Sequence, residues 1–275
     1  MGEPPAPAAS EAAPAPGAGA AAKAEFTPLE VPAGNAFADK YLAGCLSKWD
    51  LQRGMRYAHF RAGKAYHKMA GREFVGDFLG DARVQEAFRV LTKGGQWEPL
   101  GDVADFDFEA VPATLTNMEF FDRLETADPP ITRKEGTIFK CFENFVNGIQ
   151  ISDLLRDMLL NEESENAALY GEEERAQFLF LVLKHLSLGG AMCQFEDKVT
   201  AYLTCAKRCY KELLTVFKNQ KTEQIEVGSA VYRVTRASGA RDLFPSESER
   251  NFCYLAFDPF RRVCKVWYHA SANYW

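Results

Sequence analysis

Hydrophobic side chains recur at helical spacing in three stretches of the chain. In residues 36–49 the apolar positions return every three to four residues, which predicts a first amphipathic helix. Residues 172–186 are apolar on nearly every side, so we expect a central buried helix there. Residues 199–217 would place one broad apolar face on a further helix. With a turn at 189–190 between them, the last two stretches predict a buried antiparallel helix hairpin.

Alternating polar and apolar positions predict strands elsewhere. Residues 105–109 alternate acids with phenylalanine, which we interpret as an edge strand with its acids in water rather than as a metal cluster. Residues 224–235, 252–257 and 263–269 are rich in β-branched and aromatic side chains and predict three more strands. A turn signal at 258–259 favours an antiparallel pairing of the last two. The whole pattern predicts an α+β fold, with helices packed against a mainly antiparallel sheet.

Capping residues predict where two further helices begin. Asp81 precedes apolar positions at helical spacing, which predicts a helix reaching Leu91 and ended by the glycines at 94–95. Ser152 predicts the start of a short apolar helix that ends near Asn161. In both cases the side-chain oxygen would accept hydrogen bonds from free N–H groups of the first turn.

Charge and composition narrow the class of protein. The net charge of -6 argues against a dedicated nucleic-acid binder, because that affinity comes from Lys and Arg at phosphates. The longest strongly apolar run, residues 178–183, is far shorter than the roughly 18 residues that a membrane span requires, so we expect no membrane insertion. Residues 53–72 hold six Lys and Arg and no acid, and would form a basic stripe if they were helical. We interpret that stripe as a solvated face, with a contact for an acidic partner as the alternative.

The ends of the chain differ from its middle. Residues 1–24 are mostly alanine and proline, too poor in large apolar side chains to offset the entropy of ordering, and predict a disordered tail. Prolines interrupt any apolar run there, so we predict neither a secretory signal nor a transit peptide. Residues 25–275 predict a single globular domain, and the prolines after Asp128 leave open a division into two lobes near 126–136.

The seven cysteines are odd in number and lie in apolar surroundings, which is typical of thiols in a reducing compartment such as the cytosol. Cys205 and Cys209 have helical i, i+4 spacing, but no second Cys or His pair accompanies them. We therefore interpret them as core residues rather than zinc ligands. The sequence also lacks a P-loop and a Gly-rich dinucleotide motif, and we predict no cofactor and no metal.

One polar turn could carry chemistry. Cys193, His185 and Asp197 would be a nucleophile, a base and an orienting carboxylate if the fold brought them together. Nothing in the sequence supplies an oxyanion hole or a cleft, so we predict no catalytic residue and favour a hydrogen-bonded part of the core, or a turn that binds a partner. The polar and thiol residues of this turn are Lys184, His185, Cys193, Gln194, Glu196 and Asp197.

The same turn lies in a stretch that resembles a known family. Residues 178–214 (FLFLVLKHLSLGGAMCQFEDKVTAYLTCAKRCYKELL) closely resemble the core block of the cilia- and flagella-associated protein 300 family. Shorter pieces occur in the order of that family, so that the likeness covers most of residues 36–270. Within the core block it includes Gly189 and Gly190, and the shorter pieces are Gly95-Gln96-Trp97, Ile151-Ser152-Asp153, Asp258-Pro259, Arg261-Arg262 and Tyr268-His269.

The resemblance implies a function without enzymatic activity. Proteins of this family are factors for assembling or transporting the outer and inner axonemal dynein arms, and act in the cytoplasm and the cilium. The implied partners are axonemal dynein subunits, dynein preassembly factors and the intraflagellar transport machinery. Because binding energy concentrates in a few aromatic and arginine contacts, Arg261, Arg262, Tyr268 and the basic stretch 53–72 are candidate contacts. Two alternatives stay open: an enzyme or small-molecule binder that uses the 184–197 turn, and a stable structural component of the axoneme.

Overall fold

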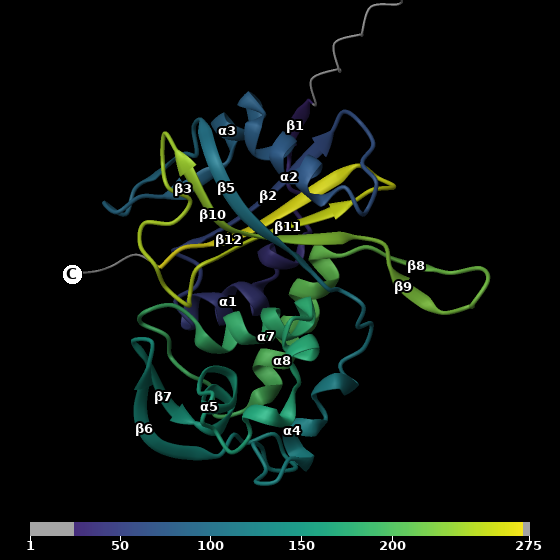
Figure 1. Ribbon diagram of the computed structural model, residues 1–275. Helices are drawn as coiled ribbons and strands as arrows, with labels where there is room; N and C mark the ends of the chain where they lie inside the picture. The colour runs from purple at the N-terminus through teal and green to yellow at the C-terminus, as the bar shows by residue number, and fades with distance from the viewer. Residues whose placement is uncertain (1–24, 272–275) are drawn as a thin grey trace, which may run out of the picture.

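A six-stranded antiparallel sheet runs through the middle of the molecule (Figure 1), in the order β1-β2-β12-β11-β10-β5. This computed structural model describes residues 25–271. The strands are β1 (Phe26–Leu29), β2 (Met55–Ala62), β5 (Val103–Val111), β10 (Ala230–Gly239), β11 (Phe252–Asp258) and β12 (Val263–His269).

The two faces of the sheet bury separate hydrophobic cores. Helices α1 (Lys40–Lys48), α5 (Leu154–Leu160), α7 (Phe178–Leu188) and α8 (Val199–Leu213) lie on one side, below the sheet in Figure 1. On the other side lie α2 (Gly71–Gly80) and α3 (Ala82–Ala87). Strand β11 is buried at every position, and its successive side chains enter the two cores alternately. Two-sided burial makes this strand apolar almost throughout.

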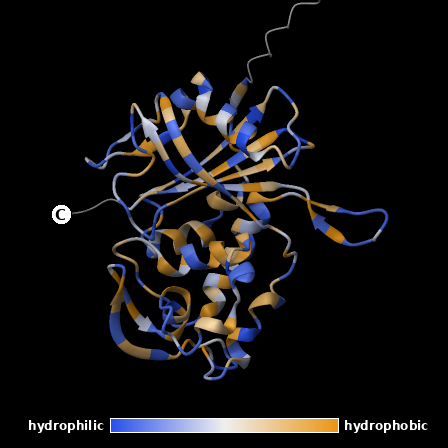
Figure 2. Cartoon of the chain, in the orientation of Figure 1, coloured by the Kyte–Doolittle hydropathy of each residue, from blue (hydrophilic) through white to orange (hydrophobic). Residues whose placement is uncertain are grey.

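Three small hairpins extend from this framework: β3 (Arg89–Leu91) with β4 (Trp97–Pro99), β6 (Lys140–Val146) with β7 (Ile149–Asp153), and β8 (Val216–Lys218) with β9 (Ile225–Val227). In Figure 2 the hydrophobic colour dominates α7, whereas the loop that joins β8 to β9 is hydrophilic. None of the helices within residues 25–271 has the length and apolar character needed to cross a membrane. The short helices are η1 (Ala36–Ala38), η2 (Glu119–Phe121), α4 (Arg123–Thr126), η3 (Ala167–Leu169) and α6 (Glu172–Arg175).

Several expectations from the sequence are confirmed. The fold is α+β, and β5 is an edge strand whose acids face water. Asp107 forms an ion pair with Arg236 of β10 at 2.7 Å. Strands β11 and β12 form the expected antiparallel hairpin, and the side chain of Asp81 accepts hydrogen bonds from the first turn of α3. Cys205 and Cys209 are buried in the core.

The basic stretch 53–72 is not a helix, so the predicted basic stripe was wrong. Strand β2 occupies its first half and pairs with β12. The side chain of Tyr57 packs against one core and that of Phe60 lies in the other, as expected for strand residues an odd number of positions apart. Successive strand residues point to opposite faces, which disperses the cations. Arg56 lies over the ring of Trp97, 3.5 Å from its centroid, while Arg61 is exposed.

Other helix boundaries also differ from the predictions. The helix after Asp81 ends at Ala87, and Leu91 belongs to β3, because the chain turns at 94–95 to form a hairpin. Ser152 lies in strand β7, and its neighbour Asp153 caps α5 instead.

The two long apolar segments that were predicted as single helices are each interrupted. The segment 172–186 is split into α6 and α7 by an extended residue at 177. The segment 199–217 ends as a helix at Leu213, which places Phe217 in β8. Helices α7 and α8 pack against each other, but their antiparallel hairpin stays a prediction, as does the division into lobes. The predicted tail at 1–24 lies outside the described residues.

A fully buried arginine joins three helices below the sheet. Arg156 of α5 forms an ion pair with Asp153 at the start of the same helix. Its Nε donates to the carbonyl oxygen of Ser187 in α7 at 3.1 Å, and its Nη2 donates to the hydroxyl of Tyr202 in α8 at 2.8 Å. The guanidinium also lies 3.4 Å from the ring centroid of Phe195. The guanidinium therefore contacts α5, α7, α8 and the segment that joins α7 to α8.

Replacing Arg156 should destabilise the protein strongly. Arg156→Met would leave Asp153 as a buried charge without its partner, and we expect a loss of about 3–5 kcal/mol in the free energy of unfolding. Urea unfolding followed by circular dichroism measures this loss. The exposed Arg133, replaced in the same way, serves as a control, and its change should stay within about 0.5 kcal/mol. Equal losses for the two variants would contradict the role assigned to Arg156.

A candidate binding pocket beside the 184–197 turn

Two of the three residues of the possible catalytic set, His185 and Asp197, pair with residues outside the set. His185 is buried, and its Nε2 lies 2.7 Å from the hydroxyl of Tyr254 in the sheet. Asp197 is exposed and forms an ion pair with Lys140 of β6 at 2.9 Å. Burial raises the pKa of the Cys193 thiol to about 12 and lowers the pKa of His185 well below its usual value. A thiol that stays protonated at neutral pH is a poor nucleophile.

The turn is held in place by hydrogen bonds to neighbouring helices. The backbone N–H of Glu196 donates to the hydroxyl of Tyr202 at 2.9 Å, next to Arg156. The carboxylate of Glu196 accepts from the indole Nε1 of Trp49 at 3.0 Å and pairs with Lys48 at 2.8 Å. These contacts attach the turn to the end of α1 as well as to α8.

Two glycines of the turn are required by close approach. A Cβ atom on Gly190 would lie 2.1 Å from the carbonyl oxygen of Asp50, and Gly189 has a φ of +61°. The N–H of Gly190 donates to the carbonyl of Trp49 at 2.8 Å, and the N–H of Met192 donates to the carboxylate of Asp50 at 2.9 Å. The loop after α1 and the 189–192 segment therefore lie directly against each other.

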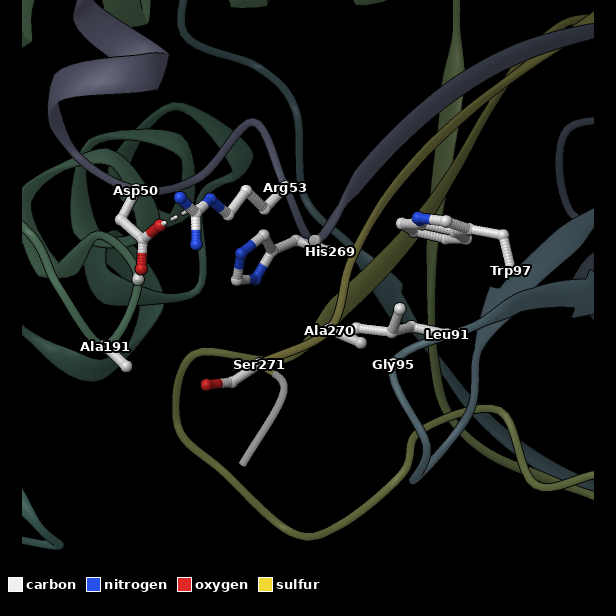
Figure 3. A pocket seen from close by; sticks show the side chains of 11 residues that line it. Asp50, Arg53, Leu91, Gly95, Trp97, Ala191, His269, Ala270 and Ser271 are labelled. Atoms are coloured by element: carbon white, nitrogen blue, oxygen red, sulfur yellow. Dashed lines mark ion pairs between the residues drawn. The ribbon is translucent and has the colours of Figure 1, made fainter. Parts of the chain in front are cut away.

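A pocket of about 170 Å³ opens where this contact meets the sheet (Figure 3). Four segments that are distant in the sequence form its walls: the loop after α1, the β3–β4 hairpin, the 189–192 segment and the end of β12. The lining residues are Asp50, Arg53, Gly54, Leu91, Gly95, Trp97, Gly190, Ala191, His269, Ala270 and Ser271.

The chemistry of the pocket combines the carboxylate of Asp50, a neutral imidazole, one cation and an apolar wall. The Nδ1 of His269 lies 2.8 Å from the carbonyl oxygen of Arg250, so Nδ1 carries the proton and Nε2 is an acceptor. Burial lowers the pKa of His269 to about 4, which keeps the ring neutral at pH 7. Arg53 is exposed at the rim, with its Nε 4.0 Å from Asp50, and Trp97 forms part of the wall. Such a cavity can hold one side chain or a small polar molecule.

Sequence reasoning did not identify Asp50 at the mouth of this pocket. Asp50 has a φ of 54°, a left-handed conformation that follows the end of α1 and favours Gly, Asn or Asp. An aspartate after the last apolar position of the helix was the available signal. A Cβ on Gly54 would lie 2.1 Å from the carbonyl oxygen of Ala270, which brings the start of β2 against the end of β12. Within residues 25–271 no group of three or more His, Cys, Asp or Glu side chains could hold a metal ion.

The remaining predicted residues separate into buried and exposed groups. Tyr268 is completely buried, donates to the carbonyl of Leu243 and accepts from the N–H of Leu91, so it cannot contact a partner from this position. Lys184 pairs with Glu249 at 3.3 Å on the outside of α7.

The β11–β12 turn carries the exposed arginines of the predicted set. Asp258 is buried, and its Oδ1 accepts from the N–H of Arg261 at 3.0 Å. Pro259 is half-buried, and both Arg261 and Arg262 are exposed. Gln194 lines a shallow hollow near Asp50, beside the pocket.

Comparison with known proteins identifies the family. The family model described as "Cilia- and flagella-associated protein 300" matches residues 23–269. The chain belongs to the cilia- and flagella-associated protein 300 family. A relative of that name from Chlamydomonas reinhardtii is 46% identical over 254 residues, which cover 91% of this chain and 99% of the relative. Another from Paramecium tetraurelia is 26% identical over 228 residues, covering 83% and 86% of the two chains. No solved structure matches the chain.

Several walls of the pocket come from the segments that resemble the family. The core block and two of the short pieces that resemble the cilia- and flagella-associated protein 300 family contribute to these walls. They contribute Gly190 of the core block, the Gly95-Gln96-Trp97 piece and His269 at the end of β12. Pieces that are far apart in the sequence therefore meet at one place in the fold.

Buried histidines make the stability of the protein depend on pH. The pKa of His269 is lowered on folding, so the unfolded chain binds more protons below about pH 6.5 and stability falls as the pH decreases. We expect His269→Asn, which keeps a donor near Nδ1, to reduce the loss between pH 7 and pH 5 by about 2 kcal/mol. Urea unfolding at the two pH values measures the difference. The same change at the exposed His67 is the control, and an undiminished loss in His269→Asn would contradict the assignment.

Proposed function

We propose that this protein is a non-enzymatic factor for the assembly or transport of outer and inner axonemal dynein arms. It acts in the cytoplasm and the cilium by binding other proteins. Its membership of a cilia- and flagella-associated family supports the location in the cilium or flagellum. The observation that favours binding over catalysis is that His185 pairs with Tyr254 and Asp197 pairs with Lys140, while burial raises the pKa of the Cys193 thiol.

The proposed partners are axonemal dynein subunits, dynein preassembly factors and the intraflagellar transport machinery. A binding protein needs exposed apolar and arginine side chains on a rigid framework. This chain exposes phenylalanines at Phe142, Phe145 and Phe260, each at least two-thirds accessible, on hairpins that extend from the two cores. These surfaces support an adaptor whose folded body presents several contacts.

A small-molecule binder is the second candidate function, and the pocket is the observation that favours it. The cavity of about 170 Å³ has the size of one side chain, with the Nε2 of His269 as an acceptor and Arg53 as a cation at the rim. The same features suit a single side chain of a partner protein. Thermal stabilisation of the purified protein by a metabolite, abolished by Trp97→Ala, would favour the small molecule.

Removal of the protein from ciliated cells tests the leading proposal. We expect quantitative mass spectrometry of isolated axonemes to find lower amounts of both outer and inner dynein arm chains. The wild-type chain and Cys193→Ser should restore these amounts equally, because the protonated thiol contributes no chemistry. A Cys193→Ser variant that melts normally but fails to restore the arms would instead support the catalytic alternative.

Extraction distinguishes a transport factor from a structural component. We expect most of the protein to leave the axoneme on washing with detergent and high salt, because transient complexes held by exposed charges weaken in salt. A stable axonemal component would remain with the doublet microtubules. Immunoblotting of both fractions, with tubulin as the marker of the doublets, measures the distribution.

A further inference from the structure

An exposed apolar cluster lies where the β8–β9 hairpin approaches the turn between β11 and β12. Phe260 is 78% exposed and Phe217 is 40% exposed, yet their ring centroids are only 6.0 Å apart. Val216 and Ile225 of the same hairpin are also more than half exposed. We call this surface the arm patch and define it by Val216, Phe217, Ile225, Phe260, Arg261 and Arg262.

Hydrogen bonds hold the backbone of the arm patch in place. The Oδ1 of the buried Asp258 accepts from the N–H of Phe260 at 2.9 Å and from the N–H of Arg261 at 3.0 Å, which fixes the turn. Strands β8 and β9 form a separate two-stranded sheet within the described residues, and no third strand pairs with either of them. The ammonium of Lys68 donates to the carbonyl of Val227 at the base of the hairpin, at 3.2 Å. The patch is therefore organised before any partner arrives, which lowers the entropy cost of binding.

The charge of the arm patch is positive on a chain whose net charge is -6. Arg261 forms a long ion pair with Asp258, at 3.8 Å, and Arg262 donates to the carbonyl of Gly63 at 3.2 Å but forms no ion pair within residues 25–271. Arg233 and Arg236 of the sheet pair more closely with acids of β5, at 3.2 Å and 2.7 Å. The guanidinium groups at the arm patch thus keep their capacity to bind carboxylates.

We propose that the arm patch binds an acidic segment of a partner protein. Apolar side chains of that segment cover Phe217 and Phe260, and its carboxylates pair with Arg261 and Arg262. In protein interfaces, a few aromatic and arginine side chains surrounded by polar residues contribute most of the binding free energy. This inference rests on the proposed function, because it names the kind of partner that an adaptor of this family binds.

Other occupants fit the charge less well. A second copy of the chain, meeting patch to patch, would bring arginines against arginines, and like charges at an interface are costly. The exposed Phe142 on β6 differs, since its neighbour Lys140 already forms a close ion pair with Asp197 at 2.9 Å. Phe142 therefore provides a matched control, because it is an exposed phenylalanine on a hairpin outside the arm patch.

The first experiment identifies what touches the patch in cells. Photoreactive benzoylphenylalanine replaces Phe260 in the full-length protein, and irradiated cells that are regrowing cilia supply the cross-linked peptides for mass spectrometry. We expect these peptides to carry several Asp or Glu with interspersed apolar residues. The same replacement at Phe142 is the control. Cross-links at 260 that equal those at 142, or that join a second copy or residues 1–24 of the same chain, would overturn the proposal.

The second experiment uses a defined probe on the purified full-length protein. A fluorescent peptide of interspersed Glu and Leu should bind, and a twin with Lys in place of Glu should not. We expect Arg261→Glu with Arg262→Glu to weaken binding about tenfold or more, and Phe260→Ser to weaken it as well. Lys93→Glu with Lys134→Glu changes the net charge equally at exposed lysines outside the patch, and should alter binding less than about twofold. Equal binding of the twins, or binding of anionic lipid vesicles in preference to the acidic peptide, would overturn the proposal.

The two proposals can fail separately. Acidic cross-linked peptides from proteins unrelated to dynein arms would leave the arm patch intact and refute the proposed function. Dynein arms that assemble normally with Arg261→Glu and Arg262→Glu, together with unchanged peptide binding, would refute the patch and leave the proposed function standing.

Discussion

The architecture below the sheet depends on one buried charge. Arg156 is enclosed by α5, α7 and α8, and each of these elements offers it a carboxylate, a carbonyl or a hydroxyl. A guanidinium out of water is tolerated only when its donors are satisfied, so the three helices must hold their relative positions. The 184–197 turn follows from this arrangement, because Phe195 packs on the guanidinium and Tyr202 also accepts from the turn.

The sheet imposes the second constraint. Because β11 and β12 are covered on both faces, their ends are the places where side chains can return to water. The pocket with His269 lies at one end of β12, and the arm patch with Arg262 lies at the other, about 20 Å away for a strand of this length. A protein that assembles others can use two such contacts at once, since a second contact within one complex raises the effective concentration of the first.

The histidine and the thiol of the 184–197 turn are best understood as parts of the core. His185 rests on Tyr254, and the half-buried Cys193 keeps its proton, so both residues serve packing and hydrogen bonding. The exposed Phe142 and Phe260, by contrast, keep 97% and 78% of their surface in water. This contrast between packed thiols and histidines and large exposed apolar side chains is the physical basis for the proposed binding function.

The sequence by itself determined the fold class, the buried character of α7, the edge strand β5 and the β11–β12 hairpin, because hydrophobic periodicity and turn residues act within a few neighbours. Tertiary structure decided the rest. Residues 55–62 of the basic stretch form a strand because β12 pairs with them, and Asp153 rather than Ser152 caps α5, where its carboxylate also pairs with Arg156. The pocket is formed by four segments that are distant in the sequence, and Phe217 approaches Phe260, which is also distant from it along the chain. Local patterns cannot contain such contacts, since they arise from the order of the strands and the packing of whole elements.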